Sequence, residues 1–116
     1  MFTIDFYRLP NGKAPVEEFL DGLETKMRNK AVDSISLLEE FGNRLTLPHS
    51  RHMGDGLYEL RIKFASDITR IFYFFFVDNR IILTNGFVKK TVKTPPNELK
   101  LAKKYKSDFE RRNQHE

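Results

Sequence analysis

LYELRIKF (57–64), TRIFYFFFV (69–77) and RIILTNGFVKK (80–90) follow one another in the middle of the chain and decide its fold. Their apolar patterns are those of β-strands, either alternating or continuous. Ala65-Ser66-Asp67 separates the first two segments, and Asp78-Asn79 separates the last two. Asp and Asn tolerate the positive φ angles of a tight hairpin. The sequence therefore predicts a three-stranded antiparallel meander.

The charged residues of this region have defined places in the predicted strands. In the first segment Glu59, Arg61 and Lys63 alternate with apolar residues, so one strand face is apolar and the other mostly charged. The second segment is apolar on both faces apart from Arg70 and Tyr73, as in a central strand covered on both sides for part of its length. Arg70 is a lone cation there, and an unpaired charge in such a strand is costly.

Strand and helix patterns flank the meander. Residues 2–6 alternate as a half-buried strand, and two helical patterns follow, the first opening at Pro15 and the second ending at Gly42. Residues 44–56 keep no period, so a loop is predicted there. A last helix follows two consecutive prolines, which a first helical turn tolerates, and either Thr94 before them or Asn97 after them is a candidate cap.

The order strand, helix, helix, strand, strand, strand, helix predicts a small α+β domain with its helices packed on one face of one sheet. The chain has 116 residues, of which 40% are hydrophobic, and this is the size and apolar content of one compact domain. We therefore expect a single domain over residues 1–116.

Composition excludes several classes of protein. The chain contains no cysteine, which excludes disulfide frameworks, zinc-thiolate sites and thiol catalysis and fits a reducing compartment. No uncharged run approaches the length that a bilayer requires, and the first residues lack the basic and apolar regions of a signal peptide. A cytoplasmic protein without a membrane partner is expected.

Positive charge is concentrated at the carboxyl end. The net charge is +4, but residues 85–116 contain nine Lys or Arg against four Asp or Glu, a local +5, and the remainder carries −1. A one-sided field of this kind favours polyanions, nucleic acid above all, or an acidic protein partner. A solvated basic helix is the simpler alternative.

Three local patterns carry a family resemblance. GLYELRI (56–62), TRIFYFFF (69–76) and GFVKKTVKTPPNEL (86–99), in this order and followed by a helix, resemble the RelE/HigB toxins of bacterial type II toxin–antitoxin systems. The similarity is greatest to the phage-derived HigB-like branch and covers nearly the whole chain. It implies a RelE/ParE-like domain with an N-terminal strand, a helical hairpin, a meander and a C-terminal helix.

The resemblance also implies a function. It predicts a ribosome-dependent endoribonuclease that cleaves translated mRNA without a metal or other cofactor, and that a HigA-like helix-turn-helix antitoxin holds inactive. Such cleavage uses the ribose 2′-hydroxyl as nucleophile on the adjacent phosphate. It needs a base, an acid for the leaving oxygen, and positive charge for the developing dianion.

Arg61 and Arg70 are the candidates for holding the phosphate. An arginine stays protonated, and its planar fork matches the phosphate oxygens. The alternative for either residue is a structural ion pair with Glu59 or Asp67. Glu59 shares a face with Arg61, so it is predicted either to orient that arginine or to accept a proton, and a plain surface carboxylate is the alternative.

The lysines after the third strand are the candidates for proton transfer and RNA contact. Crowding by other cations lowers the pKa of a lysine, so Lys89 is predicted as the acid or base. Lys90 and Lys93, with Lys63, are predicted to contact the RNA backbone. The alternative is a charged strand edge that discourages unwanted strand pairing. Tyr73 is a candidate for stacking on a base, although a packed aromatic residue is the alternative.

The sequence departs from the histidine-containing members of the wider family, because none of its histidines lies on the meander. His49 and His52 precede it and could reach RNA as acid or base, but they lack a third ligand nearby for a metal, so no metal site is predicted. Two other functions remain open. ParE toxins share this fold but bind and poison DNA gyrase, and a non-catalytic basic nucleic-acid-binding module would also explain the charge.

Overall fold

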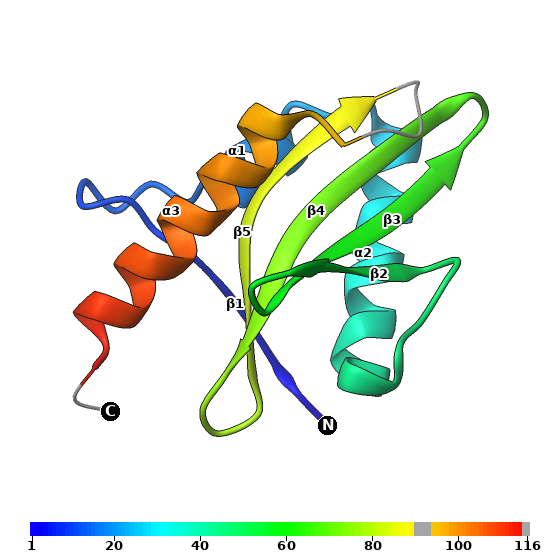
Figure 1. Ribbon diagram of the computed structural model, residues 1–116. Coiled ribbons are helices and arrows are strands. Elements are labelled where there is room, and N and C mark those ends of the chain that lie inside the picture. Colours follow the sequence, from blue (N-terminus) through cyan, green and yellow to red (C-terminus); the bar gives the residue numbers. More distant parts are fainter. Residues whose placement is uncertain (90–93, 115–116) are drawn as a thin grey trace.

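The computed structural model describes residues 1–89 and 94–114, with only the backbone of Lys89. Within them one five-stranded sheet, ordered β1-β5-β4-β3-β2, lies among three helices (Figure 1). The strands are β1 (Thr3–Phe6), β2 (Ser50–Gly54), β3 (Leu57–Phe64), β4 (Asp67–Phe76) and β5 (Arg80–Lys89). The helices are α1 (Pro15–Asp21), α2 (Thr25–Phe41) and α3 (Pro96–Arg112), and a 3₁₀ turn, η1 (Gly42–Arg44), follows α2.

The small α+β fold predicted from sequence is confirmed, and so is the meander. β3 pairs antiparallel with β4, and β4 with β5. The hairpin residues Asp78 and Asn79 have φ angles of 61° and 57°, as the tight turn requires. Pro15 occupies the first turn of α1, and Gly42 ends α2 with a φ of 52°. No helix within the described part of the chain combines the length and the apolar content needed to cross a membrane.

Two features of the sheet differ from the expectation. The loop predicted for residues 44–56 is wrong in part, because Ser50–Gly54 form β2, antiparallel to β3. This strand is short and interrupted by a register shift after His52, so it leaves no clear periodicity in the sequence. β1 pairs with β5 in parallel, with Thr3 opposite Arg80. That pairing joins distant parts of the chain.

The helices cover both faces of the sheet, so the prediction of one covered face is wrong. Val16 of α1 and Leu38 of α2 pack in one core with Leu60 and Ile71 and the other residues of that sheet face. α3 packs on the opposite face through Ala102 and Phe109, in a second core that includes Phe72 and Phe74. Successive residues of β4 point to opposite faces of the sheet, and apolar residues occur on both faces. Each face is therefore covered by a helical layer (Figure 1).

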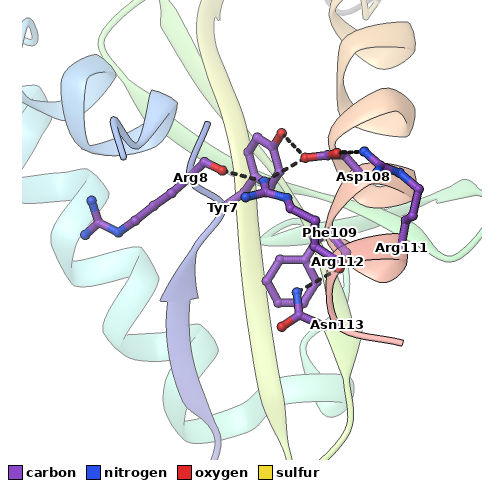
Figure 2. A network of polar contacts seen from close by, with 7 residues as sticks. All are labelled: Tyr7, Arg8, Asp108, Phe109, Arg111, Arg112 and Asn113. Atoms are coloured by element: carbon purple, nitrogen blue, oxygen red, sulfur yellow. Dashed lines mark hydrogen bonds and ion pairs between the residues drawn. The ribbon is translucent and has the colours of Figure 1, made fainter. Parts of the chain in front are cut away.

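The C-terminal half of α3 is fastened to the segment that follows β1 (Figure 2). The Tyr7 hydroxyl donates to an Asp108 carboxylate oxygen at 2.7 Å. Arg112 contacts the same carboxylate oxygen at 2.6 Å and donates to the carbonyl oxygen of Arg8 at 2.6 Å. These contacts hold the basic helix against the start of the chain.

Candidate anion-binding site

Several of the predicted site residues lie on the sheet face that α3 covers, near the N-terminal end of that helix. Arg61 of β3 is directly opposite Arg70 of β4, so their side chains project from the same face. Glu59 lies two residues before Arg61 on β3 and therefore shares that face. Two arginines placed opposite one another repel, and a carboxylate between them relieves the repulsion.

Glu59 and Arg70 form a buried ion pair. Both side chains are 0% exposed, and Arg70 Nη1 lies 3.6 Å from Glu59 Oε2. Thr94, just before α3, bridges the two: its hydroxyl accepts a hydrogen bond from Arg70 Nη1 at 3.0 Å and donates to Glu59 Oε2 at 2.6 Å. Thr94 therefore holds the segment that precedes α3 against the buried ion pair. Its side chain does not cap the helix.

Arg61 lies at the edge of this cluster and is 21% exposed. Its Nε is 3.7 Å from Glu59 Oε1, an ion pair too long for a hydrogen bond. Both predicted arginines thus make the ion pair with Glu59 that the sequence left as their structural alternative. An ion pair does not prevent Arg61 from binding an anion, because part of its side chain still faces solvent.

Arg51 is a third arginine of this site, and sequence reasoning missed it. It lies on β2 directly opposite Glu59, is exposed, and makes no ion pair with any residue in the described ranges. Burial lowers the pKa of the Arg70 guanidinium from its ordinary value; the Glu59 carboxylate opposes that shift, and the charges of Arg61 and Arg51 add to it. Because β2 was predicted as a loop, Arg51 could not be assigned to a face.

The predicted lysines are placed only in part. Lys63 of β3 is exposed, and it pairs across the sheet with Ile68, which in turn pairs with the backbone of Lys89 at the end of β5. Lys90 and Lys93 lie outside the described residues. The backbone register thus brings the end of β5 next to the β4 segment that carries Arg70.

Tyr73 does not join the arginines. It projects into the core under α1 and α2, is 1% exposed, and stacks on Tyr58 with ring centroids 5.4 Å apart. Its hydroxyl shares a hydrogen bond with Ser50, and burial raises the pKa of Tyr73 to about 12. The structure favours the packed aromatic residue that the sequence left as the alternative, because a ring enclosed in this way cannot stack on a base.

The two histidines that precede the meander differ in their position: His49 lines a pocket together with Arg61 and Lys63, whereas His52 lies on the other face of the sheet. His52 is opposite Tyr58, on the face away from Glu59, and its ring lies 4.9 Å from the Tyr58 ring. The backbone carbonyl of His49 accepts a hydrogen bond from the Arg61 N–H at 2.8 Å, which continues the pairing of the β2 and β3 edges. His49 therefore lies nearer to Arg61 than His52 does.

The cluster has the chemistry of an anion site. Arg51, Arg61, Arg70 and Lys63 bring four positive charges to one face, and Glu59 is the carboxylate that pairs with two of them. The surplus of positive charge favours a ligand with two negative charges, such as a phosphate group in its transition state. The open side is formed by Arg51, Arg61 and Lys63, whereas Arg70 and Glu59 form the buried floor.

The five-stranded α+β arrangement is compatible with a RelE-like domain. A family model described as "Phage derived protein Gp49-like (DUF891)" matches residues 18–107, from α1 to the middle of α3. Since the match covers most of the chain, the protein belongs to this phage-derived Gp49-like family, a toxin-like family related to RelE. Membership is consistent with a toxin of a toxin–antitoxin system and suggests an antitoxin partner. A search of curated proteins found no match.

Proposed function

We propose that this protein is a ribosome-dependent endoribonuclease of the HigB-like type, which cleaves translated mRNA in the cytoplasm and is neutralised by a HigA-like helix-turn-helix antitoxin. One observation carries the proposal: Arg51, Arg61 and Arg70 converge from three adjacent strands around a single carboxylate, Glu59. A toxin that only needed a basic surface would not require an arginine buried at 0% exposure beneath two accessible ones.

In this proposal the arginines divide the work. Arg61 and Arg51 bind the phosphate whose bond is cleaved, because their side chains are at least partly exposed. Arg70 is fully buried, so it acts through the electrostatic field and by holding Glu59. Its positive charge, surrounded by protein instead of water, stabilises the developing dianion more strongly than an exposed charge would.

Glu59 is proposed as a positioning residue. Its Oε2 is occupied by Thr94 and Arg70, and its Oε1 faces Arg61, so the carboxylate orients both arginines and has no open path to a ribose hydroxyl. Proton transfer is assigned to Lys89, which follows the strand residues next to Arg70. Lys63, Lys90 and Lys93 are proposed to contact the RNA backbone, where each charge strengthens binding in a salt-dependent way.

The decisive experiment is primer extension on a translated message after induction of the protein. We expect new 5′ ends in the message with the wild type, and none with Arg61→Ala or Lys89→Ala. Lys26→Ala is the matched control, because Lys26 is an exposed residue of α2, on the other side of the sheet. Co-expression of the cognate helix-turn-helix protein should abolish the new ends and restore growth.

Other results would refute the ribonuclease. Intact messages together with stalled replication would indicate a gyrase poison. Intact messages and normal growth would indicate a nucleic-acid-binding protein without catalytic activity. Circular dichroism of each variant shows whether it is folded, so that a loss of cleavage is not mistaken for a loss of structure.

A further inference from the structure

A concave surface lies near the C-terminal end of α3. A cleft of about 520 Å³ separates the C-terminal half of the helix from the chain segment after β1. Asp108 in its wall is twelve residues beyond Pro96, at the start of α3, which corresponds to about 18 Å along the helix axis. The cleft is therefore distinct from the arginine cluster. The residues that line it include Tyr7, Lys104, Tyr105, Asp108 and Arg111.

The walls of the cleft are held in place by the network of Figure 2. The Asp108 carboxylate accepts from the Tyr7 hydroxyl and is paired with both Arg111 and Arg112. These contacts hold the pKa of Asp108 below its ordinary value, with the Tyr7 hydrogen bond as the largest cause. The single carboxylate of the cleft is thus fully engaged, and the charge that remains is positive.

The cleft contains an aromatic surface flanked by cations. The Tyr105 ring stacks on the Tyr7 ring, with centroids 4.5 Å apart and planes 21° apart, and Tyr105 stays partly exposed in the cleft. The exposed Lys104 precedes it in the sequence, and it makes no ion pair within residues 1–89 and 94–114. Arg111 lines the same cleft and is 71% exposed.

We infer that this cleft binds a nucleotide of single-stranded RNA, with the base against Tyr105 and the phosphate against Lys104 and Arg111. Aromatic rings bind bases of any sequence by stacking, and neighbouring cations follow the backbone. The volume is in the range of pockets that bind small molecules. An acidic peptide would use the cations but not a flat aromatic face, so RNA fits the combination better. The inference rests on the proposed function only in taking RNA as the ligand, and it adds a second contact remote from the arginines.

The test measures binding without cleavage. A short fluorescein-labelled 2′-O-methyl polyuridine, which lacks the nucleophilic hydroxyl, is titrated with the full-length protein and followed by fluorescence anisotropy. Tyr105→Leu should weaken binding about fivefold or more, the lower end of the effect of losing one stacked base. Tyr105→Phe keeps the ring and should bind as the wild type does.

Salt dependence tests the phosphate contact. Lys104→Gln should reduce the slope of log affinity against log salt by about 0.7, the value for one phosphate contact to a single strand. Lys26→Gln makes the same charge change on α2 and should leave the slope unchanged. Equal slopes for these two variants would overturn the inference, because net charge alone would then explain binding.

Two further outcomes are decisive. A folded Tyr105→Leu protein with wild-type RNA affinity would overturn the inference. The inference would also be overturned if Tyr105→Leu bound a decaglutamate peptide more weakly than the wild type does but bound RNA equally well. If messages stay intact in cells but Tyr105→Leu still weakens RNA binding, the ribonuclease proposal fails and the cleft inference stands. If messages are cleaved and Tyr105→Leu binds normally, the cleft inference fails alone.

Discussion

Replacing Glu59 by glutamine tests the electrostatic account of the arginine cluster. The two side chains differ by one charge and have nearly the same shape. The amide oxygen of glutamine can still accept the hydrogen bond that Thr94 donates at 2.6 Å. The substitution therefore removes the negative charge 3.6 Å from Arg70 and leaves the packing in place. Arg70, at 0% exposure, becomes a buried cation that has lost this carboxylate.

The expected loss of stability is large. Removing one partner of a buried ion pair costs about 3–5 kcal/mol, because the remaining charge keeps its desolvation penalty and loses the opposite charge. Domains of this size have free energies of unfolding of about 5–15 kcal/mol, so the loss is a substantial fraction of the total. With a dependence on urea of about 1–3 kcal/mol per molar, the unfolding midpoint should fall by roughly 2 M.

Urea unfolding followed by circular dichroism measures this loss. Glu18→Gln is the control, because Glu18 pairs with Lys13 at 3.9 Å on the surface and is 60% exposed; its loss should stay below about 1 kcal/mol. The double variant Glu59→Leu/Arg70→Met removes both buried charges and should recover most of the stability. A loss below about 1 kcal/mol for Glu59→Gln would refute the claim that this carboxylate compensates Arg70.

Three further predictions concern other parts of the fold. The pKa of Asp108 is lowered in the folded state, so its contribution is present above about pH 4 and is lost as pH falls; acid unfolding of Asp108→Asn should lack this component. Tyr7→Phe should cost about 1 kcal/mol for the lost hydrogen bond. Since the pKa of Tyr7 is raised to about 12, alkaline titration of the wild type should show a loss of stability as pH rises from 10 toward 12, and this loss should be smaller in Tyr7→Phe. Gly42→Ala would place a Cβ 2.0 Å from the Phe2 ring at a φ of +52°, so a loss of at least about 2 kcal/mol is expected in thermal unfolding.

Local patterns predicted the elements of the fold better than their assembly. The alternation in β3, the apolar run of β4 and the Asp78-Asn79 turn each have a short-range signal, and the structure confirms the meander that they predict. The parallel partner of β1 has no such signal, because it depends on residues that are far away in the sequence. The packing of α3 on the opposite face could have been inferred, because β4 is apolar on both faces and each face must be covered by other residues.

The candidate site was predictable in its residue types and not in its contacts. Arg70 stood out because charges are rare in a strand that is apolar on both faces, and Arg61 because it lies on the charged face of the neighbouring strand. Their convergence follows from the register. The burial of Glu59 depends on α3 and Thr94, which the charged face of an isolated strand does not reveal. Arg51 was overlooked because a strand of five residues with a register shift gives no periodic signal.

The pairing of the first strand with the last has a consequence during synthesis. Thr3 leaves the ribosome early, but its partner Arg80 is made only after roughly two thirds of the chain, about 4–15 s later at ordinary elongation rates. Until then β1 has no strand to pair with, so its backbone N–H and C=O groups stay hydrogen-bonded to water. The sheet of the nascent chain therefore stays incomplete until Arg80 and the rest of β5 have been made.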